Sequence, residues 1–145
     1  MKEEYVTYKQ AIKLKKLGFD WDVNKVYHRH STLAEWELFP WHSEYNDWNN
    51  EGKFFRSAPT LSLAQKWLRE VKKIDVLVFN NACGYGWEIS KADPQSMGTM
   101  IVFFDDNGED EPSGMWWTYE KALSAGIDAA LDLLTNSTKN DNKTI

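Results

Sequence analysis

A capping hydroxyl followed by a helical apolar pattern occurs three times in this sequence. The phrases read TYKQAI, TLSLAQ and TYEKAL, and they begin at Thr7, Thr60 and Thr118. A threonine at this position accepts a hydrogen bond from a backbone N–H group of the first turn, which has no partner inside the helix. Each phrase therefore predicts the start of a helix. The phrases are short enough to arise from good helix starts alone, so they do not indicate internal duplication.

The apolar spacing predicts the extent and the buried face of each helix. The first covers residues 8–17 and stops at Gly18, where a left-handed residue followed by the apolar Phe19 would close the last turn. The second has the clearest stripe, with apolar residues at i, i+3, i+4 and i+7: Ala64, Trp67, Leu68 and Val71. The third runs to about Leu134 and contains Gly126, which lowers helix stability by ~1 kcal/mol and would allow close backbone packing.

Residues with a preference for β structure fill the two blocks between the helices. Six runs are predicted as strands: 26–30, 35–39, 54–55, 75–79, 85–90 and 99–105. The last three form an antiparallel meander with turns at Asn80-Asn81 and Asp93-Pro94, because parallel strands would need long crossovers. The predicted fold is α+β, with three helices packed on a mainly antiparallel sheet in the order α-β-α-β-α. We expect one domain over residues 1–134 and a flexible C-terminal tail over 135–145.

Composition is typical of a soluble cytoplasmic protein. The chain of 145 residues is 42% hydrophobic and 27% charged, and no apolar run approaches the roughly 18 residues that span a bilayer. The charged N-terminus and the single Cys83 indicate neither a signal peptide nor an internal disulfide. The net charge of -5 argues against binding of duplex nucleic acid, which needs a concentrated basic surface. We expect no membrane association.

No metal site, cofactor or catalytic set is predicted. His28 and His30 share a strand face at a spacing that can bind zinc, but a third ligand would have to come from His42, Cys83 or a carboxylate in another segment. Cys83 would act as a nucleophile only beside a histidine, and the Asn and Gly residues around it indicate a turn. The histidines are interpreted as exposed strand residues, and Cys83 as part of a turn.

Five carboxylates gather at the end of the last predicted strand: Asp105, Asp106, Glu109, Asp110 and Glu111. A helix-loop-helix calcium loop starting at Asp105 would need glycine at position 110 and glutamate at position 116, where the chain has Asp110 and Trp116. A hairpin turn at Asn107-Gly108 with a solvated acidic tip is the simpler interpretation. This acidic hairpin could serve as a docking patch.

Aromatic residues are the best indication of function, because they make up 14% of the chain and include 8 Trp. The candidates for an aromatic interaction surface are Trp36, Trp41, Tyr45, Trp48, Trp116 and Trp117. Consecutive strand residues point to opposite faces, so Trp116 and Trp117 cannot both enter one core, and at least one is expected at an outer surface. For the turn-rich stretch 40–52 two interpretations stay open: an interaction surface, or a lid of tryptophans over a core filled by Trp36 and Leu38.

Three segments of the chain carry a family resemblance. They are SAPTLSLAQKWLREV at residues 57–71, TYEKALSAGIDAAL at 118–131, and the opening helix up to Asp20. Together they cover roughly a third of the chain. They resemble a family of small uncharacterised proteins of gut bacteria and their phages. The resemblance implies a phage or mobile-element setting and carries no established activity. In such a setting we expect an accessory protein with an anti-defence or host-modulating role.

These observations lead to two hypotheses of function. The first is a non-enzymatic cytoplasmic protein that binds a protein partner, or a second copy of itself, through the aromatic residues or the acidic hairpin. The alternative is a protein that binds or sequesters a small nucleotide between aromatic rings, with Arg29 or Arg56 contacting its phosphate. An enzyme ranks third, because it would require Cys83 or the histidines to meet a carboxylate in a cleft.

Overall fold

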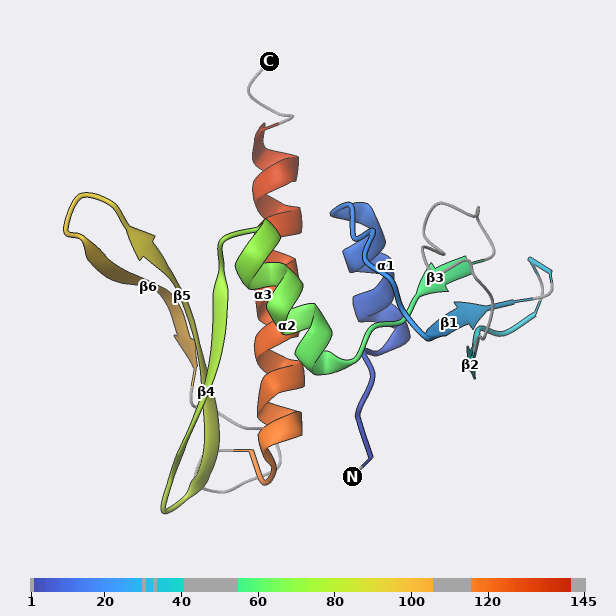
Figure 1. Ribbon diagram of the computed structural model, residues 1–145, viewed down its shortest axis with the longest axis horizontal. Coiled ribbons are helices and arrows are strands. Elements are labelled where there is room, and N and C mark those ends of the chain that lie inside the picture. The colour runs from blue at the N-terminus through green and yellow to red at the C-terminus, as the bar shows by residue number, and fades with distance from the viewer. Residues whose placement is uncertain (1, 30, 33, 41–54, 106–115, 142–145) are drawn as a thin grey trace. The chain divides into compact units, whose positions relative to one another are not determined.

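The fold is α+β, as the sequence predicts. The computed structural model describes residues 2–29, 31–32, 34–40, 55–105 and 116–141, which form three helices and two three-stranded antiparallel sheets (Figure 1). The chain divides into two compact units: unit 1 comprises Met1–Leu63 with Leu131–Ile145, and unit 2 comprises Ala64–Ala130. Within the described part of the chain, every helix is too short or too polar to cross a lipid bilayer.

The first helix, α1 (Tyr8–Lys16), begins and ends as its sequence predicts. Thr7 forms a capping box, in which its hydroxyl accepts from the Gln10 amide at 3.2 Å and its own amide donates to Gln10 Oε1 at 2.9 Å. Gly18 has a φ of 90° at the other end, and the amide of Phe19 donates to the Leu14 carbonyl at 3.0 Å. Glycine adopts this left-handed conformation without strain, which explains the sharp stop.

The first sheet has the strand order β2-β1-β3 and belongs to unit 1. Its strands are β1 (Lys25–His28), β2 (Glu37–Pro40) and β3 (Phe55–Ser57). Tyr27 in the central strand lies opposite Leu38 on β2 and Arg56 on β3, so these three side chains share one face of the sheet. The strand predicted over 26–30 ends at His28.

The N-terminal segment is tied to the start of the second helix. Tyr5 forms an isolated β-bridge with Thr60, and the Val6 amide donates to the Pro59 carbonyl at 3.0 Å. The amide of Leu61 donates to the Glu4 carbonyl at 2.9 Å, which satisfies one of the N–H groups that a helix start leaves free. Backbone bonds thereby fix residues 4–6 in unit 1.

The second helix, α2 (Leu61–Val71), buries three of its four predicted stripe residues. Thr60 caps it by accepting from the Leu63 amide at 3.1 Å. Ala64, Trp67 and Leu68 are each 0% exposed, whereas Val71 is 46% exposed. The prediction for Val71 is wrong, because it lies at the last residue of the helix, where the chain turns away.

The second sheet has the strand order β4-β5-β6, and it is the predicted antiparallel meander. Its strands are β4 (Asp75–Asn81), β5 (Gly84–Asp93) and β6 (Gly98–Asp105). The turn predicted at Asn80-Asn81 lies instead at Ala82-Cys83, because both asparagines pair with β5. Since β4 pairs with β5 only as far as Ser90, β5 and β6 continue beyond it as a two-stranded ribbon (Figure 1).

The third helix, α3 (Tyr119–Asp141), extends further than predicted. The flexible tail expected over residues 135–145 is helical as far as Asp141. No Gly or Pro interrupts the sequence after Gly126, and the Thr135 hydroxyl donates to the Leu131 carbonyl at 2.9 Å. An ion pair of 2.6 Å between Asp132 and Lys13 of α1 also holds this part of the helix within unit 1.

Gly126 allows α3 to approach the second sheet closely within unit 2. A Cβ atom placed on Gly126 would lie 2.7 Å from Cγ1 of Val76 and 3.1 Å from Cβ of Trp87. These separations are shorter than van der Waals contact, so no side chain fits there without displacing its neighbours. The close packing predicted for this glycine is confirmed.

Candidate anion-binding site

Trp36 lies just before β2 and is enclosed by residues of unit 1. The ring of Tyr8, from the first turn of α1, stacks on it with centroids 5.0 Å apart and planes 27° apart. Trp36 is half-buried. It therefore neither fills the core, as one interpretation of the sequence suggested, nor stands free at the surface.

Two arginines lie over the same indole ring. The guanidinium carbon of Arg29, which follows β1, is 4.8 Å from the Trp36 ring centroid, and that of Arg56 on β3 is 5.0 Å from it. Both separations are those of cation–π contacts, which hold a guanidinium by electrostatic attraction to the ring face. Arg29 and Arg56, which were predicted as alternative phosphate contacts, thus lie together. Both lie on Trp36, which was predicted to belong to the aromatic interaction surface.

A third cation adds positive charge beside Arg56. Lys15 of α1 donates to the Phe55 carbonyl at 3.4 Å, and Arg56 donates to the same carbonyl at 2.7 Å. Burial, and then the positive charge of Arg56, lower the pKa of Lys15. An anion bound between the two would relieve this repulsion and raise that pKa again. We call Tyr8, Lys15, Arg29, Trp36 and Arg56 the Trp36 cluster.

Arg29 also has an unused donor. Its Nε atom is buried and has no hydrogen-bond partner among the residues that the structure describes. A buried donor of a charged group is costly to leave unsatisfied, typically by 1–3 kcal/mol or more. Because the protein covers this atom, a ligand could reach it only if the guanidinium group moved.

Tyr27 connects the cluster to a neighbouring hollow. Its ring contacts Tyr8 edge to face, with centroids 5.8 Å apart, and its hydroxyl donates to the Val6 carbonyl at 2.8 Å. Burial raises the pKa of the Tyr27 phenol, which therefore stays protonated as a donor. The hydrogen bond to the Val6 carbonyl holds the Tyr27 ring in position.

The hollow, which we call the Tyr5 groove, has a volume of about 1030 Å³ and lies entirely in unit 1. Its lining residues are Lys2, Glu3, Glu4, Tyr5, Lys25, Tyr27 and Leu38. Tyr27 and Leu38 lie side by side on adjacent strands, and the Lys25 ammonium lies 4.3 Å from the Tyr5 ring centroid. The groove thus combines apolar and aromatic surface with two cations and two carboxylates.

The net charge of the chain is unevenly divided between the two units. Unit 1 has 11 basic and 11 acidic residues, whereas unit 2 has 6 basic and 11 acidic residues. The net charge of -5 therefore comes entirely from unit 2. An overall acidic composition does not argue against an anion site in unit 1.

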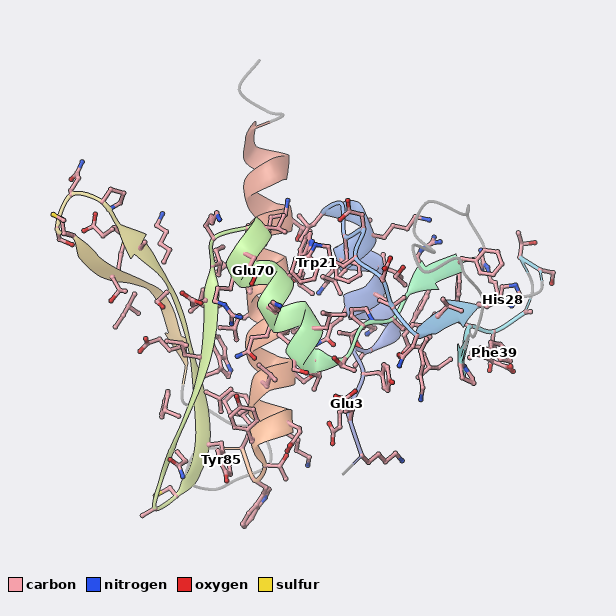
Figure 2. The ribbon with its side chains drawn as sticks, in the orientation of Figure 1. Glu3, Trp21, His28, Phe39, Glu70 and Tyr85 are labelled. Atoms are coloured by element: carbon pink, nitrogen blue, oxygen red, sulfur yellow. The ribbon has the colours of Figure 1, made fainter. Side chains whose placement is uncertain are left out.

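The opposite face of the first sheet carries separate rings. His28 stacks on Phe55 at 4.6 Å and contacts Phe39 edge to face at 6.0 Å, and Figure 2 shows His28 and Phe39 close together at this sheet. Its suggested zinc partners His30 and His42 lie outside the described residues. Within the described ranges, no three His, Cys, Asp or Glu side chains gather in a way that could hold a metal ion.

A second aromatic group lies in unit 2. Trp116 forms an isolated β-bridge with Tyr85, and its ring lies 6.4 Å from that of Trp87. Trp117 is 62% exposed. As alternation predicts, one member of the Trp116-Trp117 pair reaches the surface. Tyr119 is exposed beside them and contacts the Tyr85 ring at 6.2 Å.

The other predicted site residues are less informative. Asp105 ends β6 opposite Trp87, and Cys83 is exposed in the β4–β5 turn. Seven candidates lie outside the described residues: Trp41, Tyr45, Trp48, Asp106, Glu109, Asp110 and Glu111. Residues 41–52 of the turn-rich stretch, to which the interaction-surface and lid interpretations apply, also lie outside the described residues, as does the predicted Asn107-Gly108 turn.

Sequence reasoning missed Tyr8 and Lys15 as members of the Trp36 cluster, and Lys25 and Tyr27 as lining residues of the Tyr5 groove. One signal was present for two of them: Lys25 and Tyr27 alternate along β1, and Arg29 follows the strand at the same spacing. Lys15 is one of several lysines on a short helix and has no distinguishing pattern.

Comparison with known proteins identifies no relative. No family model matches this chain, and no similar curated protein or solved structure was found. The resemblance of the helical segments to phage and gut bacterial proteins therefore stays a prediction.

Proposed function

We propose that this chain is a non-enzymatic binding protein whose Trp36 cluster holds the phosphate of a small phosphorylated ligand such as a nucleotide. The observation that carries the proposal is the placement of two guanidinium groups on one indole, with the Lys15 ammonium beside them. Guanidinium groups bind phosphate through paired hydrogen bonds, and an aromatic platform fixes their orientation before the ligand arrives.

The same geometry favours phosphate over a stacked base at this position. Tyr8 and the two arginines already lie against the Trp36 ring. A base could stack on Trp36 only by displacing one of them, whereas a phosphate could bind to guanidinium groups that stay on the ring. The base of a nucleotide would then lie elsewhere in unit 1.

Removing both guanidinium charges should abolish most of the binding. We expect the double substitution Arg29→Gln and Arg56→Gln to weaken AMP or ATP binding by about 100-fold or more, since each hydrogen bond to a charged group contributes about 1.5–3 kcal/mol. Isothermal titration calorimetry at low salt would measure this effect, with inorganic phosphate as a third probe. The matched control is Arg69→Gln, an exposed arginine of α2 that should leave the affinity unchanged.

A thermal melt of each variant would show that the fold is intact. The single substitution Lys15→Gln provides an independent check, because it should weaken phosphate binding while leaving both stacked arginines in place. The proposal is wrong if the unmodified protein binds none of the three probes at millimolar concentration, or if the double variant binds them equally well.

A second candidate function, binding of a protein partner, is favoured by the exposed β5–β6 ribbon. Met97 at its tip is 93% exposed, and Ile101 is 59% exposed. Isolated exposed side chains are ordinary, but apolar residues clustered on a projecting hairpin are typical of contact surfaces.

The ribbon can be tested separately from the cluster. We expect Met97→Ser with Ile101→Ser to abolish capture of a specific protein, or self-association seen by light scattering, without changing phosphate binding. Lys91→Ser, an exposed ribbon residue, is the control. The support for this surface would be removed if the unmodified protein, the double variant and the control captured the same partner equally and had the same molar mass by light scattering.

The cellular setting is part of the proposal. We place the binding activity in the cytoplasm of a bacterial host, as a phage or mobile-element accessory with an anti-defence or host-modulating role. The support is the resemblance of the helical segments and the single cysteine, which fits a reducing compartment.

A further inference from the structure

We infer that the phosphorylated ligand is a single-stranded nucleic acid, whose backbone passes from the Trp36 cluster into the Tyr5 groove. This inference rests on the proposed phosphate site. It goes further by assigning a role to the groove and by naming a polymer, rather than a mononucleotide, as the ligand.

The spacing of cations along β1 carries the first step. Lys25, Tyr27 and Arg29 alternate on one side of the chain, with Lys25 in the groove and Arg29 in the cluster. The Lys25 ammonium lies over the Tyr5 ring, whereas the Arg29 guanidinium lies over the Trp36 ring. Successive phosphates of one strand could therefore contact one cation each.

The floor of the groove supplies the second step. Tyr27 and Leu38 offer aromatic and apolar surface beside Lys25, whose ammonium lies over the Tyr5 ring, and Tyr27 is held in place by its bond to the Val6 carbonyl. Proteins that bind single strands combine a basic track with aromatic rings on which bases stack. Bases that are unpaired can reach such a floor, while those of a duplex cannot.

The number of cations fits a single strand better than a duplex. Besides Lys2 at the N-terminus, four cationic side chains line the path, namely Lys15, Lys25, Arg29 and Arg56. Unit 1 as a whole has balanced charge, with 11 basic and 11 acidic residues, and so gives no excess of positive charge to attract a duplex. Four phosphate contacts predict that the logarithm of the binding constant falls with the logarithm of salt concentration with a slope of about -3.

Two carboxylates oppose a polyanion in the groove. Glu3 and Glu4 lie on the N-terminal segment that forms one wall, where Figure 2 labels Glu3. Removing these carboxylates should change the binding affinity in the opposite direction to removing a cation. Replacing them by glutamine should tighten binding of a strand that enters the groove, and should not affect a ligand confined to the cluster.

The experiment is fluorescence anisotropy with labelled dT2, dT10, rU10 and a ten-base-pair duplex, alongside calorimetry with AMP. We expect dT10 or rU10 to bind at least about tenfold more tightly than dT2, because added bases stack and added phosphates pair with cations. Comparing dT10 with rU10 shows whether the 2′-hydroxyl contributes. The duplex should bind more weakly than either strand.

Two variants locate the path. Lys25→Gln should weaken dT10 binding several-fold and leave AMP binding unchanged, and Glu3→Gln with Glu4→Gln should strengthen dT10 binding. Arg69→Gln is again the control, and a thermal melt verifies folding. The inference would be overturned, and the phosphate site would stand, if AMP, dT2 and dT10 bound with equal affinity. The same would hold if neither groove variant changed the affinity for dT10. Loss of all binding, including AMP, would remove the proposed function as well.

Discussion

Replacing Gly126 by valine is expected to lower the free energy of unfolding by about 3 kcal/mol, and alanine should already be destabilising. Alanine is the better helix former, by about 1 kcal/mol, so in an unconstrained helix it would stabilise the protein. Here its Cβ would lie 2.7 Å from Val76 and 3.1 Å from Trp87. Both neighbours are nearly fully buried, at 1% and 3% exposure, so they have little room to move.

The sign of the alanine effect is the decisive measurement, and urea unfolding followed by circular dichroism would give it. Ala129→Val, at a half-buried position of the same helix, controls for the general effect of a larger side chain. Combining Gly126→Ala with Val76→Ala should recover part of the loss, because the second change removes the clashing methyl group. If alanine at 126 raises the stability by about 1 kcal/mol, α3 and β4 do not approach as closely as described.

Replacing Trp67 by alanine should cost about 3–5 kcal/mol, the range for large buried side chains. Trp67 is 0% exposed and is the largest of the fully buried side chains of the described residues. The loss combines the transfer of the indole to water with the cavity that remains. In a domain of this size the melting temperature should fall by about 10 °C or more.

A matched control lies on the same helix. Val71 was expected on the same stripe but is 46% exposed, so Val71→Ala should change the stability by less than about 0.5 kcal/mol. Trp67→Phe should have an intermediate effect, since it keeps an aromatic ring in the core. A loss below about 1 kcal/mol for Trp67→Ala would mean that the indole is not packed in the core.

The helices were largely predictable because their signals are local. The capping threonines and the Gly18 stop act through bonds within a few residues of themselves, and each is formed as expected. The extension of α3 was missed because a polar sequence rich in Asn and Thr has weak helix propensity, and the bond from Thr135 and the ion pair at Asp132 lie outside what propensity describes.

The strands were predictable in kind but not in pairing. Alternation identifies which segments are extended, yet two sheets rather than one, and a turn at Ala82-Cys83 rather than Asn80-Asn81, depend on register. The Trp36 cluster depends on the same information. Arg29 and Arg56 meet because β1 pairs with β3 across a long segment, and charge alone cannot indicate that pairing.

Gln10 illustrates how one position can restrict the sequences that this fold accepts. It closes the capping box of α1, yet it is only 2% exposed. Glutamate is the usual substitute in a capping box, but here it would bring a carboxylate into the interior. An apolar residue would suit the interior but would lose the bond to Thr7. Of these three side chains, only glutamine both closes the capping box and keeps an uncharged group in the interior, so two separate demands of the fold meet at this one position.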